Sequence, residues 1–134
     1  MKNIYDFINI KNNNIEDEIK NSIHKVKEDL KELITERMCK IYTSYLYLNL
    51  KEKGVLSKII DTKEDLNLDY SHYFLVIPKD NNYSYIIDLT YSQFKYNSLF
   101  EELYLNGFQL LNKIEYKEYL NNISEAINKQ NIKR

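Results

Sequence analysis

The sequence predicts an α+β fold in which helices pack on a small antiparallel sheet. Apolar residues recur at three- and four-residue steps over residues 15–34 and again over 38–50, the spacing of helices that bury one face. Two runs rich in β-branched and aromatic residues, 71–77 and 83–90, flank a polar five-residue loop and predict a β-hairpin. Because the 134 residues show no repeat and no linker, we expect a single domain over residues 1–134.

Two helices are expected in the N-terminal half. Residues 1–14 are interpreted as a lead-in, and Asn14 is a candidate N-cap for the first helix. Thr35 predicts a break and the N-cap of a second helix, which is apolar on most sides and ends at Gly54. Cys39, the chain's only cysteine, lies in the first turn of that helix, where free N–H groups and the helix dipole favour a thiolate.

Short elements are expected to follow on both sides of the hairpin. The final helix carries an apolar face that includes Tyr119. The expected elements are a strand over 55–60, a loop over 61–69, a polar-aromatic turn over 91–97, a partly helical segment over 99–111 that breaks at Gly107, and a last helix over 116–128.

The expected hairpin brings a histidine and an aspartate together. If Ile77 pairs with Tyr83, His72 lies directly opposite Asp88, so that both side chains share one face with Cβ atoms about 5 Å apart. A carboxylate in that position can orient an imidazole. Together with Cys39, these residues supply the nucleophile, the base and the orienting group of cysteine catalysis.

Each of these residues also has a plainer interpretation. A lone cysteine is often a small buried apolar residue, and a strand histidine is often a hydrogen-bonded core side chain. Asp88 could cap a turn through its own backbone, although a carboxylate on an apolar strand is costly unless it is paired. We favour the catalytic hypothesis because the three residues occur in combination. His24 falls on the polar side of the first helix, and we expect it to be solvated.

Composition and charge argue against several functional classes. Nineteen basic and twenty acidic side chains nearly cancel without a basic patch, so we do not expect nucleic acid as a partner. No apolar run approaches the length of about 18 residues that spans a bilayer. Because the N-terminus lacks the pattern of a signal peptide, we expect a cytoplasmic location or delivery by signal-independent secretion. A single cysteine leaves no multi-cysteine zinc site, and we expect neither a metal nor another cofactor.

Several short motifs between Arg37 and Phe94 carry a family resemblance. They are the helix-opening Cys39, the pair Gly54-Val55, the strand His72-Tyr73-Phe74-Leu75-Val76 and the segment Ile86-Ile87-Asp88-Leu89-Thr90. Together they resemble the transglutaminase-like branch of the papain-like superfamily of cysteine hydrolases. The stretch Asp88-Leu89-Thr90-Tyr91-Ser92-Gln93-Phe94 also resembles the D-x-T-x-x-Q-F pattern of papain-like bacterial toxin and effector domains, some of which deamidate glutamine.

The resemblance implies a papain-like or transglutaminase-like core and an assignment of roles. Cys39 would be the nucleophile, His72 the base and Asp88 the orienting group, with Gln93 helping to form the oxyanion hole. The implied activity is hydrolysis of an amide in a protein or peptide, as a glutamine deamidase or a peptidase. The alternatives are acyl transfer of the transglutaminase type and a non-catalytic protein-interaction module on the same scaffold.

The chain departs from the family pattern near the expected site. Arg37-Met38, Tyr73 and Leu89 stand where family members often carry glycine, tryptophan and proline. Four tyrosines flank the site, and we interpret most of them as packing residues whose hydroxyl groups reach water rather than as a substrate groove. These are Tyr70, Tyr73, Tyr91 and Tyr96.

Overall fold

The computed structural model describes residues 15–30, 39–94 and 97–132, with side chains as far as residue 127. Within these residues the chain forms five α-helices and one four-stranded antiparallel sheet, which confirms the predicted α+β class. The helices are α2 (Ile15–Leu30), α3 (Cys39–Glu52), α4 (Thr62–Leu66), α5 (Glu101–Asn106) and α6 (Lys113–Ile132). The strands are β1 (Lys58–Asp61), β2 (Tyr73–Pro78), β3 (Tyr83–Ile87) and β4 (Phe108–Asn112), in the order β1-β2-β3-β4.

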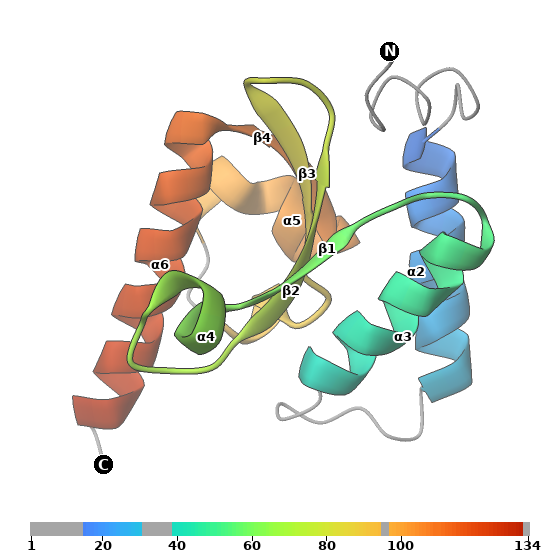
Figure 1. Ribbon diagram of the computed structural model, residues 1–134. Helices are drawn as coiled ribbons and strands as arrows, with labels where there is room; N and C mark the ends of the chain where they lie inside the picture. Colours follow the sequence, from blue (N-terminus) through green and yellow to red (C-terminus); the bar gives the residue numbers. More distant parts are fainter. Residues whose placement is uncertain (1–14, 31–38, 95–96, 133–134) are drawn as a thin grey trace.

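The sheet lies between two layers of helices. Figure 1 shows α2 and α3 on one face of the sheet and α6 on the other. Because side chains alternate along a strand, Leu75 and Ile77 join the core beneath α2 and α3, while Phe74 and Ile86 join the core beneath α6. Burial on both faces explains why these strands are apolar at nearly every position.

The helices of the first layer follow the expected pattern. The described part of the first helix ends at Leu30, and its buried positions recur at three- and four-residue steps. The second helix places Cys39 in its first turn and is followed by Gly54, whose φ of 80° is the left-handed conformation expected of a helix C-cap. His24 is exposed, as predicted. The expected lead-in and the candidate caps Asn14 and Thr35 lie outside the described residues.

The register of the hairpin differs from the predicted one by two residues. Ile77 pairs with Tyr85, not with Tyr83, and Pro78 pairs with Ser84. The turn is centred on Asn81 and not on Asp80, and the Asp80 carboxylate accepts the backbone N–H groups of the two residues that follow Asn81. A shift of two keeps every side chain on its predicted face. His72 and Asp88 therefore share a face as diagonal neighbours and not as the directly opposed pair that we expected.

Two further expectations need correction, and one strand was not predicted. The strand expected over 55–60 begins only at Lys58. The segment expected to be a loop over 61–69 contains α4, which starts because the Asp61 side chain caps the Lys63 N–H, and which stops at Asn67 in the left-handed conformation. The segment over 99–111 is helical in part and breaks at Gly107, as predicted, but its last residues are not an irregular or helical continuation. These residues form β4, because a short apolar run can pair with the free edge of β3.

Candidate functional site

His72 and Asp88 form a buried hydrogen-bonded pair at one end of the central hairpin. His72 immediately precedes β2 and Asp88 immediately follows β3, and antiparallel pairing places these two ends side by side. The His72 Nε2 atom lies 2.7 Å from Asp88 Oδ2. Only 3% of His72 and 2% of Asp88 are exposed to solvent. Burial of both groups makes this contact far stronger than a similar contact at the surface would be.

The Asp88 carboxylate is surrounded by hydrogen-bond donors. Its Oδ1 atom accepts the Thr90 backbone N–H at 3.2 Å and the Thr90 hydroxyl at 3.3 Å. Its Oδ2 atom accepts the Tyr119 hydroxyl at 2.7 Å in addition to His72. The Asp88 backbone N–H donates to the Gly107 carbonyl at 2.8 Å. Four donors on one buried carboxyl group fix its orientation.

Thr62, the first residue of α4, holds the backbone of His72. Its hydroxyl accepts the His72 N–H at 2.9 Å and donates to the Tyr70 carbonyl at 2.6 Å, and its own N–H donates to the His72 carbonyl at 3.0 Å. The His72 ring packs against the edge of Phe94, with centroids 5.0 Å apart. Backbone bonds and ring packing together leave the imidazole little freedom to rotate.

The half-buried thiol of Cys39 interacts electrostatically with the same imidazole. Burial raises the pKa of Cys39, but hydrogen bonds to the His72 ring and to the Tyr73 backbone outweigh burial and lower the pKa. Since Nε2 of His72 is engaged with Asp88, Nδ1 is the nitrogen left for the thiol. His72 is thus bonded to Asp88 and is close enough to influence the pKa of Cys39.

The histidine strongly favours its protonated form. Burial lowers the pKa of His72, yet the charge and hydrogen bond of Asp88, with a smaller contribution from Cys39, raise it to about 10. A high proton affinity on the imidazole and a lowered pKa on the thiol favour transfer of the thiol proton to the ring. Both shifts favour a thiolate–imidazolium pair over the neutral pair of thiol and imidazole.

Gln93 lies close to this group in the chain, but its side chain is not tied to it. It ends the 3₁₀ turn Tyr91–Gln93, and its backbone N–H donates to the Thr90 carbonyl at 3.1 Å. Its neighbour Phe94 contacts the His72 ring. Within the described part of the chain, the half-buried Gln93 amide makes no hydrogen bond, so its expected role at an oxyanion hole stays a prediction.

Two of the four flanking tyrosines attach the site to α6. The Tyr91 hydroxyl donates to Asn122 Oδ1 at 2.6 Å, and the Tyr70 hydroxyl lies 2.8 Å from Ser124 Oγ. Tyr73 is partly buried beneath the Lys40 ammonium group, 5.7 Å from the ring centroid. Tyr96 lies outside the described residues. Tyr70 and Tyr91 therefore pack with their hydroxyl groups on α6 and not on water.

Sequence reasoning missed two residues of the site, Tyr119 and Thr62. Tyr119 was recognised only as part of an apolar helical face, and its one distinguishing signal was a hydroxyl on that face. Thr62 fell within a segment that we expected to be a loop. Both act through hydrogen bonds to residues distant in the sequence, at Asp88 and at His72.

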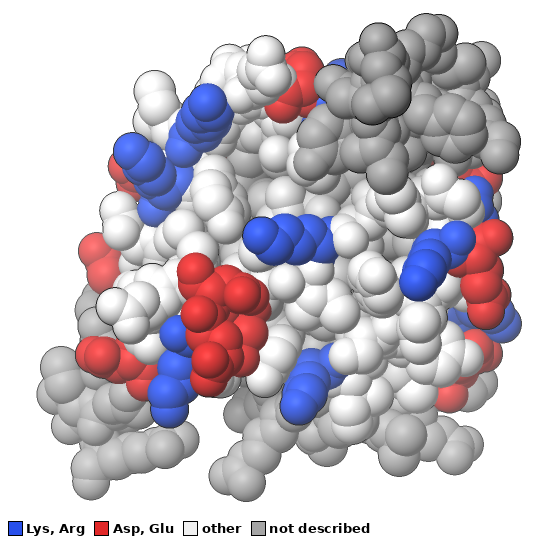
Figure 2. Space-filling view, viewed as in Figure 1, with Lys and Arg blue, Asp and Glu red and all other residues white. Residues whose placement is uncertain are grey.

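The surroundings of the site carry negative charge on one side. Figure 2 shows acidic side chains gathered over α4, whereas basic side chains are dispersed over the same face. The acidic residues of the first turn of α4 are Glu64 and Asp65, and Asp61 caps the helix. Among the described residues, no three His, Cys, Asp or Glu side chains are grouped as a metal ion would require.

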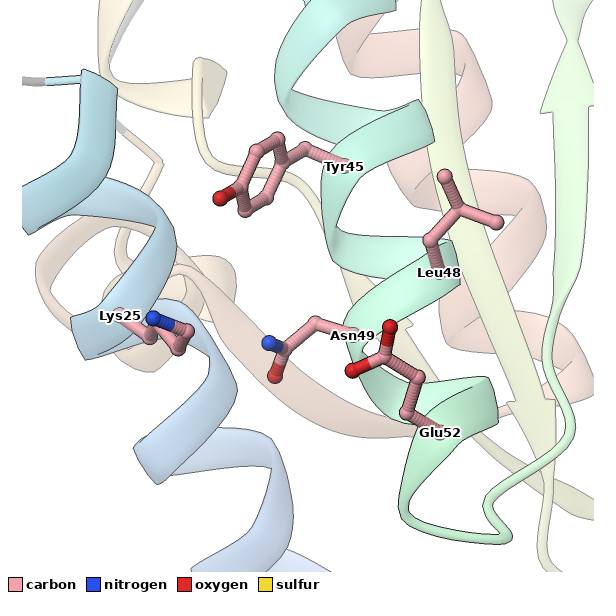
Figure 3. Close-up of a pocket in the computed structure, with 5 residues that line it drawn as sticks. All are labelled: Lys25, Tyr45, Leu48, Asn49 and Glu52. Atoms are coloured by element: carbon pink, nitrogen blue, oxygen red, sulfur yellow. The ribbon is translucent and has the colours of Figure 1, made fainter.

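A separate hollow lies between α2 and α3, as Figure 3 shows. Its volume is about 250 Å³, and it contains none of the three residues described above. Its walls are Lys25, Tyr45, Leu48, Asn49 and Glu52.

No helix in the described part of the chain has both the length and the apolar character needed to cross a bilayer.

Comparisons with protein-family models, with curated proteins and with solved structures find no match to this chain.

Proposed function

We propose that this protein is a cysteine-dependent amide hydrolase that acts on a protein or peptide, as a glutamine deamidase or a peptidase. The observation that supports this proposal is a buried imidazole that is bonded to a buried carboxylate and that lowers the pKa of the chain's only thiol. A cysteine nucleophile requires a base within hydrogen-bonding reach and a third group that orients the base. The resemblance of residues 37–94 to the papain-like superfamily supports the same assignment.

In the first step, the Cys39 thiolate would attack the carbonyl carbon of the amide and form a C–S bond. The carbonyl oxygen becomes an oxyanion, for which the Cys39 backbone N–H at the start of α3 and the Gln93 amide are candidate donors. The C–N bond then breaks, and the imidazolium of His72 gives its proton to the leaving nitrogen. Asp88 keeps the ring oriented throughout.

In the second step, water would resolve the thioester. Neutral His72 takes a proton from the water as its oxygen attacks the carbonyl carbon. Breakage of the C–S bond releases a carboxylic acid and restores the thiolate and imidazolium. A glutamine side chain handled in this way yields glutamate and ammonia, whereas a backbone amide yields two peptide fragments. An amine in place of water would give acyl transfer.

The first test is the reactivity of the thiol. Because Cys39 is the only cysteine, iodoacetamide labelling of the intact protein reports this residue alone. We expect labelling of the folded protein to follow an apparent pKa well below the ordinary value of about 8.5, and to lose that behaviour in His72→Ala. A thiol that labels no faster than free cysteine at neutral pH would contradict the proposal.

The second test identifies the reaction. Candidate proteins are incubated with the enzyme, and their intact masses are compared with those after incubation with Cys39→Ala. A gain of one dalton indicates deamidation, a cut indicates proteolysis, and an adduct with an added amine indicates acyl transfer. Since Cys39 is half-buried, its change to alanine is expected to leave the fold intact. Turnover that persists in folded Cys39→Ala or in folded His72→Ala would show that the roles are misassigned.

A further inference from the structure

Tyr119 makes a contact that the chemistry above does not use. Its hydroxyl donates to Asp88 Oδ2 at 2.7 Å, the same oxygen that accepts His72 Nε2 at 2.7 Å. The tyrosine is completely buried. A buried hydroxyl on an otherwise apolar helix face is costly to leave unpaired, so the position of this group is set by its bond to Asp88.

Packing fixes the place of the Tyr119 ring. Its centroid lies 5.2 Å from that of Phe74 and 5.8 Å from that of Tyr91. Both partners belong to segments next to the site. Phe74 lies in β2, two residues after His72, and Tyr91 lies three residues after Asp88. These ring contacts therefore hold the Tyr119 hydroxyl of α6 in place beside the Asp88 carboxylate.

Other bonds attach the same two segments to α6. The Tyr91 hydroxyl reaches Asn122, and the Tyr70 hydroxyl reaches Ser124. The segment before His72 and the segment after Asp88 are thus both held by one helix. Among these three contacts, the bond of Tyr119 is the one that touches the carboxylate itself.

We propose that Tyr119 is a positioning residue that holds the Asp88 carboxylate toward His72 and, by sharing Oδ2, limits how tightly His72 keeps its proton. The catalytic meaning of this inference rests on the proposed function. A base that never releases its proton cannot give it to a leaving nitrogen, and a second donor on Oδ2 takes up part of the charge that would otherwise act on the imidazolium.

The inference is tested on His72 directly by NMR of the ring resonances in wild type and in Tyr119→Phe. The chain has two histidines, and the exposed His24 serves as an internal reference. Without the hydroxyl, Asp88 Oδ2 accepts a bond from His72 alone, while Oδ1 keeps its two bonds from Thr90. We therefore expect the His72 titration to move to higher pH by about one pH unit, and the Nε2 proton resonance to move downfield.

Tyr91→Phe is the matched control. It also removes the hydroxyl of a fully buried tyrosine that bonds to another residue, but that bond goes to Asn122 and not to Asp88. We expect little change at His72 in this variant. Equal His72 resonances in Tyr119→Phe and Tyr91→Phe would overturn the inference, because a tyrosine that only packs has no reason to change the ring's proton affinity.

The wild-type chain provides a second reading that does not depend on the stability of a variant. The Tyr119 hydroxyl proton and the His72 Nε2 proton are both hydrogen-bonded to Asp88 Oδ2. A nuclear Overhauser contact between the two protons is therefore expected. Its absence from a spectrum that shows both protons would also overturn the inference. These readings are independent of turnover. Ordinary reactivity of the Cys39 thiol would count against the proposed function and leave the NMR result standing.

Discussion

Replacement of Asp88 by asparagine changes a single atom of the site, and its consequence can be worked out from the hydrogen bonds. On the Oδ1 side the new amide group would meet the Thr90 backbone N–H, which cannot accept a bond. The NH₂ group must therefore take the Oδ2 side, where it faces His72 and Tyr119. To accept from this NH₂, His72 must carry its proton on Nδ1, toward Cys39. In that tautomer the ring cannot take the proton of the thiol.

The size of the effect follows from the two pKa values. Asp88→Asn removes the main cause that raises the pKa of His72 to about 10 and leaves burial, which lowers it. Cys39 then loses its charged partner. An ordinary thiol with a pKa of about 8.5 is roughly 3% ionised at pH 7, so return of Cys39 from full ionisation to an ordinary pKa would slow alkylation by about 30-fold. Because burial raises the pKa of this thiol, we expect a fall of about tenfold or more.

The assay is the second-order rate of iodoacetamide labelling across pH, with circular dichroism to show that the variant is folded. Asp69→Asn is the matched control, because it removes the same charge at an exposed position near His72 in the chain. The charge of Asp88 by itself raises the pKa of Cys39. If Asp88 acted on the thiol only through its charge, its removal would lower the pKa of Cys39, and folded Asp88→Asn would be labelled faster than wild type. An unchanged or higher labelling rate would therefore refute the reasoning.

The remaining predictions concern stability. Because the pKa of His72 is raised from 6.5 to about 10, its contribution to the free energy of unfolding is fully present below pH 6.5 and is lost as pH rises toward 10. Urea titrations of Cys39→Ala over this range should show the loss without the opposing titration of the thiol, and constant stability would contradict it. Thr62→Val should cost about 1–3 kcal/mol in urea unfolding, because the His72 N–H loses its buried acceptor; a cost near zero would argue against that bond. Gly107→Ala should lower the free energy of unfolding by about 1–2 kcal/mol in thermal or urea unfolding, and by more than Gly54→Ala does. Both glycines have a positive φ, but only at Gly107 would the new Cβ meet a leucine methyl group, at 2.9 Å. Equal losses in the two variants would mean that the close contact relaxes.

The helices and the hairpin could be predicted because their signals are local. Apolar spacing identified the first helix, and Gly54 marked the end of the second. The strand β4 was missed because its five residues carry no periodicity that separates a strand from a continued helix. The free edge of β3 decides between the two, and that edge exists only in the assembled sheet.

The hairpin shows how a sequence argument can place residues together on a wrong pairing. The turn is centred one residue later than predicted, and the Asp80 side chain bonds two backbone N–H groups within it. Side-chain faces repeat every two residues along a strand, so an error of two in the register kept His72 and Asp88 on one face. An error of one would have separated them.

The sequence by itself determined which chemical groups this protein has, the faces of its helices and strands, and the placement of one cysteine in the first turn of a helix. Tertiary structure decided the partners of those groups. The hydroxyl of Tyr119 on Asp88, the hydroxyl of Thr62 on His72 and the thiol of Cys39 beside the imidazole join residues from separate elements. Local spacing specifies only which side of an element a group occupies. Packing of the layers specifies the atom that the group meets, because a buried polar group is stable only where a partner lies within bonding distance.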